Sequence, residues 1–314
     1  MGGAAPHVTR ARTAAGATLV VAAASVLAWA LAYPHASLTV TLVRAVSVCA
    51  AVVTLGLAAV PMLDGERHRD ELMDRAATPL AAAAAVWLLS ELTRLVVAAA
   101  QTAGVGVLRL DVGTVTDFAI ATTPGRSGLV ALAAAAVVCT GALAAPRTAS
   151  TVAVLTGVAA IGVVARPLTG HFSESALGGL AVAVHMLAAA LWCGALAALV
   201  LTVQHRGQWA RMLPRFSALA LGCVLALVAA GVLAAALRLE SAADLYATGY
   251  GRVLSAKIAV TAALVALAWR NRTMWLPAAR SHRATAVVSR ARSMVELAMM
   301  AVALALAAGL AVTG

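Results

Sequence analysis

Long apolar runs recur along this chain and constrain its fold more than any other feature. Runs of about 18 residues or more are long enough to cross a bilayer. They lie at roughly 15–33, 38–62, 78–100, 127–145, 150–168, 177–203, 216–238, 252–270 and 293–313. Because a bilayer offers no partners to backbone polar groups, runs of this length indicate helices. We therefore predict an all-α polytopic transmembrane helical bundle of about 8–9 spans.

The composition agrees with a membrane protein: 63% of the residues are hydrophobic and 11% are charged. We expect the first run to remain as a helix, because its apolar core is long and no clear small-residue cleavage site follows it. No stretch between the runs is long enough to fold alone, and no catalytic motif stands out. The protein is therefore not predicted to be an enzyme.

Arginine placement predicts the orientation of the bundle. The N-terminus and every second loop carry 15 arginines in total, whereas the loops on the opposite side carry five. By the positive-inside rule the N-terminus is cytoplasmic and the C-terminus is outside. The net charge of +11 then reflects topology and attraction to anionic lipid. We expect the bilayer to be a partner and nucleic acid not to be one, because the chain has no soluble basic face.

The polar loops and the cysteines complete this outline. Asp64–Arg75 is predicted to form a short solvated helix or loop. Arg270–Arg292 is predicted to lie at the headgroup surface, because it is purely basic. Gln101–Arg126 is predicted to contain a small re-entrant or surface element. The four cysteines all fall inside predicted spans without a CxxC pair (Cys49, Cys139, Cys193, Cys223). A disulfide framework is therefore not expected.

The segment 170–198 holds the strongest candidate site. His171 stands at the outer mouth of the sixth run, and His185 lies about eight residues inside it, near 12 Å deep. Met186 and Cys193 share a helix face next to that of His185. Polar side chains are costly in a bilayer and therefore mark function. Imidazole, thioether and thiolate are ligands that copper prefers, although His171 alone fits a plain solvated loop.

Other polar residues inside the spans have structural interpretations. Glu91 and Arg94 are three residues apart and can meet on one helix face as a self-neutralising pair. Lys257 lies about five residues inside the eighth run. It either extends outward to the interface or pairs with a carboxylate such as Glu296 of the ninth run.

Several ordered motifs resemble the copper resistance D (CopD) membrane domain over about 170–310. They are Gly170-His171, His185 to Trp192 with Gly194, Arg215-Phe216-Ser217, Gly231, Asp244 to Arg252 with Lys257, Asn271-Arg272, and Val295-Glu296-Leu297. The N-terminal half, including Ser90-Glu91-Leu92, resembles actinobacterial members more loosely. Two departures from the family pattern are Gly194-Ala195 for Gly-Gly and His171-Phe172 for His-Ala.

The resemblance implies a multi-pass plasma-membrane protein in which 1–168 forms N-terminal helices and 169–314 a CopD-like copper domain. It implies copper movement across the membrane, generally uptake, with His171 catching the ion and His185 receiving it. Met186 or Cys193 would offer a soft ligand if the ion is Cu(I) rather than Cu(II). No Walker pattern is present, so movement is passive or driven by the membrane potential. An extracytoplasmic copper chaperone or a cytochrome oxidase assembly factor is the expected partner.

Two alternatives remain open from the sequence. One is a haem-binding electron-transfer bundle, although only His185 lies deep and such sites commonly need paired histidines. The other is a copper-handling partner for oxidase assembly that does not transport. A further question is whether His171 and His185 share one ion. They are too far apart along a straight helix, but a break near Gly178-Gly179 would bring them together.

Overall fold

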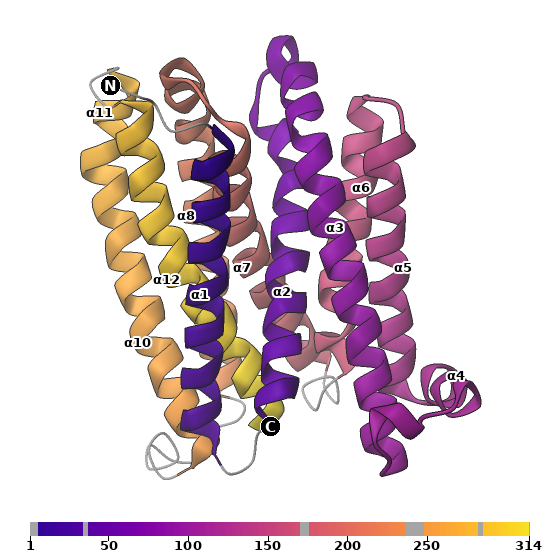
Figure 1. The fold of residues 1–314 in the computed structure, drawn as a ribbon. Helices are drawn as coiled ribbons and strands as arrows, with labels where there is room; N and C mark the ends of the chain where they lie inside the picture. The colour runs from indigo at the N-terminus through magenta and orange to yellow at the C-terminus, as the bar shows by residue number, and fades with distance from the viewer. Residues whose placement is uncertain (1–5, 34–36, 170–175, 237–247, 282–284, 314) are drawn as a thin grey trace.

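The computed structural model is a bundle of long helices aligned along one axis (Figure 1). It describes residues 6–33, 37–169, 176–236, 248–281 and 285–313, and these ranges contain no β-strand. The helices α1, α10 and α12 lie together at one side, and α3, α5 and α6 lie at the other. Helices α2 and α7 pack against each other between the two groups. The predicted all-α polytopic bundle is confirmed.

Nine long helices among the described residues overlap the nine predicted apolar runs. They are α1 (Pro6–Ala32), α2 (Leu38–Ala59), α3 (Glu66–Ala103), α5 (Thr123–Ala144), α6 (Ala149–Ala165), α7 (Ala176–Thr202), α8 (Arg206–Ala236), α10 (Gly249–Arg270) and α12 (Ala286–Thr313). Seven of these are long and apolar enough to span a membrane. The apolar stretches of α1 and α6 are shorter. The 17 residues of α6 rise about 26 Å, close to the thickness of a bilayer core.

The segment 101–126 contains structure of its own. A 3-10 turn (Val107–Arg109) leads into the short helix α4 (Val112–Ala121), which packs beside α3 and α5 at one end of the bundle (Figure 1). The side chain of Asp111 accepts a hydrogen bond from the Thr114 N–H at 2.9 Å and so caps α4.

The segment 64–75 is not the separate helix or loop that its mixed charge suggested. A 3-10 turn (Val60–Leu63) follows α2, and α3 begins at Glu66 and continues for 38 residues. The segment therefore forms the first turns of a spanning helix. An ion pair between Arg75 and Glu71, one turn apart at 2.6 Å, supports these turns.

Asp64 ties this corner to α8. The Arg211 guanidinium donates through Nε and Nη2 to the two carboxylate oxygens of Asp64, at 2.8 and 2.9 Å. Burial alone would raise the pKa of Asp64, but hydrogen bonds from Arg211 and the Gly65 N–H, with the charge of Arg211, hold this pKa below its usual value. The carboxylate is therefore ionised at neutral pH and fixes the end of α2 and the 3-10 turn Val60–Leu63 against α8.

The basic segment 270–292 lies only partly at the surface. Arg270, Arg290 and Arg292 are exposed, but α10 continues through a π-helical turn (Asn271–Trp275) into α11 (Leu276–Arg280). Asn271 and Trp275 of this turn are buried. A location of the arginines at the headgroup surface remains a prediction, whereas the π-helical turn directs Asn271 and Trp275 into the bundle.

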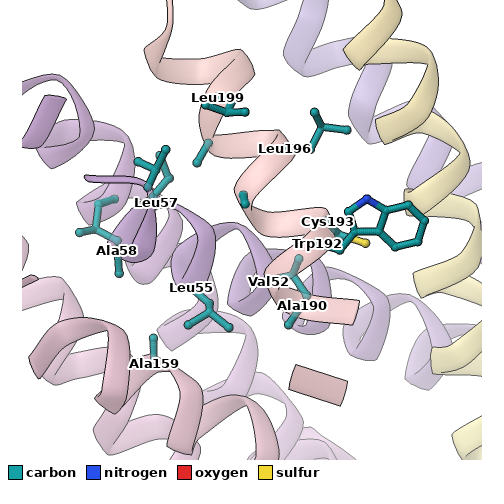
Figure 2. Close-up of a cluster of buried hydrophobic side chains, with 14 of the residues drawn as sticks. Val52, Leu55, Leu57, Ala58, Ala159, Ala190, Trp192, Cys193, Leu196 and Leu199 are labelled. Carbon is teal, nitrogen blue, oxygen red and sulfur yellow. The ribbon is translucent and has the colours of Figure 1, made fainter. Parts of the chain in front are cut away.

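Close backbone contact joins the middle of the bundle. A Cβ on Gly56 of α2 would lie 1.9 Å from the Gly194 carbonyl oxygen of α7, and a Cβ on Gly194 would lie 2.2 Å from the Val52 carbonyl oxygen. Small residues permit such crossings. The apolar cluster in Figure 2 surrounds this crossing and draws Leu55 from α2, Ala159 from α6 and side chains along α7 into one core.

Candidate functional site

His185 lies in α7 and is held by the backbone of α8. Its Nδ1 lies 3.1 Å from the Leu227 carbonyl oxygen. Because a carbonyl oxygen only accepts, Nδ1 carries the proton, and the lone pair of the neutral ring lies on Nε2. Metal-ligating histidines are commonly oriented in this way, with one ring nitrogen donating to a carbonyl and the other on the metal. The ring is therefore oriented to offer Nε2 to a soft or borderline cation.

Gly231 makes room for this imidazole. It lies one turn after Leu227 on α8, and a Cβ at this position would be 3.4 Å from both Cε1 and Nδ1 of His185. A side chain larger than methyl would extend into the space that the ring occupies. The glycine thus allows the ring to rest against the backbone of α8, close to the carbonyl that orients it.

Lys257 is a basic residue inside α10, one of the helices long and apolar enough to span a membrane. Lys257 is partly buried and makes no hydrogen bond or ion pair with any residue that the structure describes. The pairing with Glu296 that the sequence left open is not formed. The Glu296 carboxylate instead accepts a hydrogen bond from Asn271 Nδ2 at 2.8 Å.

A second polar group lies nearer the other end of α7. Glu296 of α12 is 3% exposed, and the π-helical turn presents Asn271 to it. Figure 2 shows the Trp192 indole directed from α7 toward α12. The buried Nε1 of Trp192 belongs to the surroundings of the Glu296 carboxylate, although it makes no hydrogen bond of normal geometry with the described residues. Isolated π turns occur frequently at functional sites.

Cys193 lies beside this group and is buried. All four cysteines of the chain are free thiols. Across the described ranges, no three His, Cys, Asp or Glu side chains are close enough to hold a metal ion together. Cys193 is thus a potential soft ligand without a preassembled partner set.

The structure separates most of the residues that the sequence grouped. His171 lies outside the described residues. His185 and Cys193 are eight residues apart on one helix, which places them about 12 Å apart along its axis. They cannot ligate one ion in this arrangement. Met186 is partly buried next to His185 in the chain, and α7 runs unbroken through Gly178 and Gly179, so the suggested helix break is absent.

The predicted Glu91–Arg94 pair is present as part of a larger cluster. Arg94 Nη1 lies 2.7 Å from Glu91 Oε1, and Arg166 at the end of α6 donates through Nε to Oε2 at 2.6 Å. Ser47 of α2 also donates to Oε1. Gly128 of α5 accommodates the guanidinium of Arg166, since a Cβ there would be 2.7 Å from its Nη2. The sequence had assigned Arg166 to an outer loop. Only its position beside the end of a span indicated that its side chain could reach a carboxylate inside the bundle.

Two family matches account for most of the chain. Residues 210–310 match the family described as copper resistance protein D, and residues 34–178 match its N-terminal domain, described as copper resistance protein D-like. The chain belongs to the copper resistance protein D family. It is accordingly a multi-pass membrane protein of a family associated with copper resistance and transport, and this family is not a known enzyme family.

The matches extend the resemblance that the sequence suggested. The N-terminal half, which resembled the family only loosely, matches over 34–178. The part of α7 that carries His185 and Cys193 lies between the two matched ranges. No curated protein and no solved structure matches the chain. The roles of these two residues therefore rest on their chemistry and surroundings.

Proposed function

We propose that this protein carries copper ions across the plasma membrane, with its N-terminus in the cytoplasm, its C-terminus outside and net movement inward. Copper is the transported ion in this proposal. The family assignment supports copper as the ion, and the arginine distribution supports the orientation. Division into N-terminal helices over 1–168 and a copper domain over 169–314 remains part of the proposal.

The orientation of His185 carries the proposal. Placing a histidine within a span costs free energy, so its presence there indicates a function. This one has its Nδ1 proton bound to the Leu227 carbonyl, which leaves Nε2 available as a ligand. Gly231 keeps space for the ring in this pose. A structural histidine would instead satisfy both nitrogens.

The ion would pass through successive stations along α7. His171 would receive it at the outer surface and His185 about 14 Å inside the helix. Met186 or Cys193 would supply a sulfur ligand, as Cu(I) prefers. Since His185 and Cys193 cannot share an ion, transfer from one to the other is a movement along α7. The inside-negative membrane potential would favour inward movement of a cation.

Metal binding by the purified protein tests this proposal. The full-length chain in detergent is titrated with Cu(I), under reducing conditions, against a chromophoric Cu(I) chelator. We expect His185→Ala to weaken binding about tenfold or more, as loss of a metal ligand does. His205→Ala is the matched control, because His205 is exposed near the start of α8 and should leave binding unchanged. Equal Cu(I) binding by wild type and His185→Ala would remove His185 from the path.

Two further readouts distinguish the alternatives. A haem absorption band in the purified protein that disappears in His185→Ala would overturn the copper proposal in favour of an electron-transfer bundle. Copper uptake into liposomes containing the protein separates transport from binding alone. Binding through His185 without uptake would instead indicate a copper-handling partner of an oxidase assembly factor or an extracytoplasmic chaperone.

A further inference from the structure

The helices α5 and α6 pack against each other at one edge of the bundle (Figure 1). An open groove of about 370 Å³ lies between them, where α5 begins and α6 ends. Its volume is within the range of small-ligand sites, about 300–1,000 Å³. None of the described residues that line it belongs to α7. The candidate copper site therefore does not account for this groove.

The walls of the groove are apolar. Their side chains come from α5, α6 and the 3-10 turn that follows α6 (Pro167–Thr169), and they are those of Val130, Ile161, Val164 and Leu168. Val130 and Ile161 are exposed and so face the lipid in a bundle that spans a membrane. Val130 lies seven residues after α5 begins, which places it about 10 Å from the end of the helix. A hydrocarbon chain that lies along the bundle would contact these walls over this length.

The mouth of the groove is polar and carries a positive charge. Thr123 and Arg126 lie in the first turns of α5, and of the described residues that line the groove Arg126 alone is charged. The guanidinium of Arg126 is exposed and makes no hydrogen bond or ion pair with any residue that the structure describes. Arg166, which follows Ala165 of the groove, instead donates to Glu91 inside the bundle. Arg126 therefore remains available to a ligand in the groove.

An arginine at the end of a spanning helix lies at the level of the lipid headgroups. Its guanidinium matches the geometry of a phosphate group, and basic pockets between spanning helices bind anionic headgroups. A zwitterionic headgroup carries a cation beside its phosphate, which offsets the attraction to Arg126. The charge at the mouth and the apolar walls below it therefore complement a lipid whose headgroup has a net negative charge.

We propose that the groove between α5 and α6 is a binding site for an anionic phospholipid. Arg126 and Thr123 bind the headgroup phosphate, and one acyl chain lies along Val130 and Ile161. This site is separate from the proposed copper path and does not depend on it.

Native mass spectrometry of the full-length protein in detergent tests the headgroup. The protein is titrated with dioleoyl phosphatidylglycerol and with dioleoyl phosphatidylcholine, which carry the same acyl chains. We expect the first phosphatidylglycerol to bind about fivefold more tightly, as one basic residue near a charged headgroup provides. Arg126→Gln should remove this preference and Arg126→Lys should retain it. Arg109→Gln is the matched control, because Arg109 is also exposed at this end of the bundle but does not line the groove.

A second pair of variants tests the walls. Ile161→Trp places a large ring in the groove and should remove the first, tightest binding event for both lipids. Val154→Trp is the matched control and should bind them as wild type does. Val154 lies two turns from Ile161 on the same face of α6, and both side chains are 60% exposed.

Four results would overturn the inference. They are equal wild-type affinities for the two lipids, an equal loss of preference in Arg126→Gln and Arg109→Gln, unchanged binding in Ile161→Trp, or a dimer that Ile161→Trp abolishes. The dimer would assign the groove to a second copy of this chain. Failure of the copper proposal is distinguishable, because the lipid titrations contain no metal and leave His185 unchanged.

Discussion

Two polar groups in different halves of the bundle are engaged to different degrees. In the N-terminal half, the carboxylate of Glu91 is surrounded by donors from three helices, and both of its oxygens are engaged. In the C-terminal half, His185 bonds through Nδ1 to the Leu227 carbonyl, and its Nε2 has no hydrogen bond to any residue that the structure describes. Satisfied polar groups stabilise a bundle, whereas an available imidazole nitrogen can bind a metal ion. In our proposal the first group therefore holds the fold and the second serves copper movement.

The largest effect is expected from Glu91→Gln. This change keeps the shape of the side chain but leaves Arg94 and Arg166 without their shared carboxylate. Breaking a buried ion pair on one side costs about 3–5 kcal/mol. We expect a correspondingly lower thermal unfolding midpoint in detergent, whereas Glu66→Gln, at an exposed position in the same helix, should be neutral. Near-normal stability of Glu91→Gln, with impaired metal binding by the folded protein, would reverse the assignment of the two halves.

A smaller effect is expected from Asp64→Asn at the junction of α2 and α3. The change weakens two charge-assisted hydrogen bonds from Arg211, worth about 2 kcal/mol at neutral pH. Asp70→Asn, at an exposed carboxylate in the same region, is the control.

The stabilisation by Asp64 also depends on pH in a defined direction. Because the pKa of Asp64 is lower in the folded protein, its contribution is complete above the unfolded value near 4 and is lost as pH falls through the folded value. Unfolding midpoints measured from pH 7 down to pH 3 should therefore decline less steeply for Asp64→Asn than for wild type. Parallel declines would show that Asp64 does not contribute.

The smallest effect concerns the surroundings of His185. Gly231→Leu should push the imidazole away from the Leu227 carbonyl and weaken Cu(I) binding about tenfold while the protein stays folded. Gly222→Leu lies on the same helix, where a Cβ would meet nothing within 4 Å, and it should leave binding unchanged. Equal affinities for the two variants would show that the pose of the ring does not matter.

The sequence predicted the helices well because apolar length is a local property. It also predicted the Glu91–Arg94 contact, since these residues are one turn apart on one helix. The partners Arg166, Asn271 and Arg211 escaped prediction, because each reaches its carboxylate from a helix that is distant in sequence. The pattern of apolar residues along the chain does not predict which helices pack against each other.

For the candidate site, too, local features were predictable and contacts between helices were not. His185 stood out because a histidine within an apolar run is conspicuous by itself. Its orientation by Leu227 and Gly231 depends on how α7 and α8 pack. The sequence therefore singled out the candidate residue, whereas its hydrogen-bond partner and the space for its ring became clear only from the structure.

The contact between Gly56 and Gly194 limits how α2 and α7 can move relative to each other. Because neither glycine has a side chain, the two backbones lie in direct contact there. A shift of α7 along α2 by one residue would bring a side chain against the backbone of the other helix. The crossing therefore fixes the register of α7, and with it the depth of His185 in the bundle.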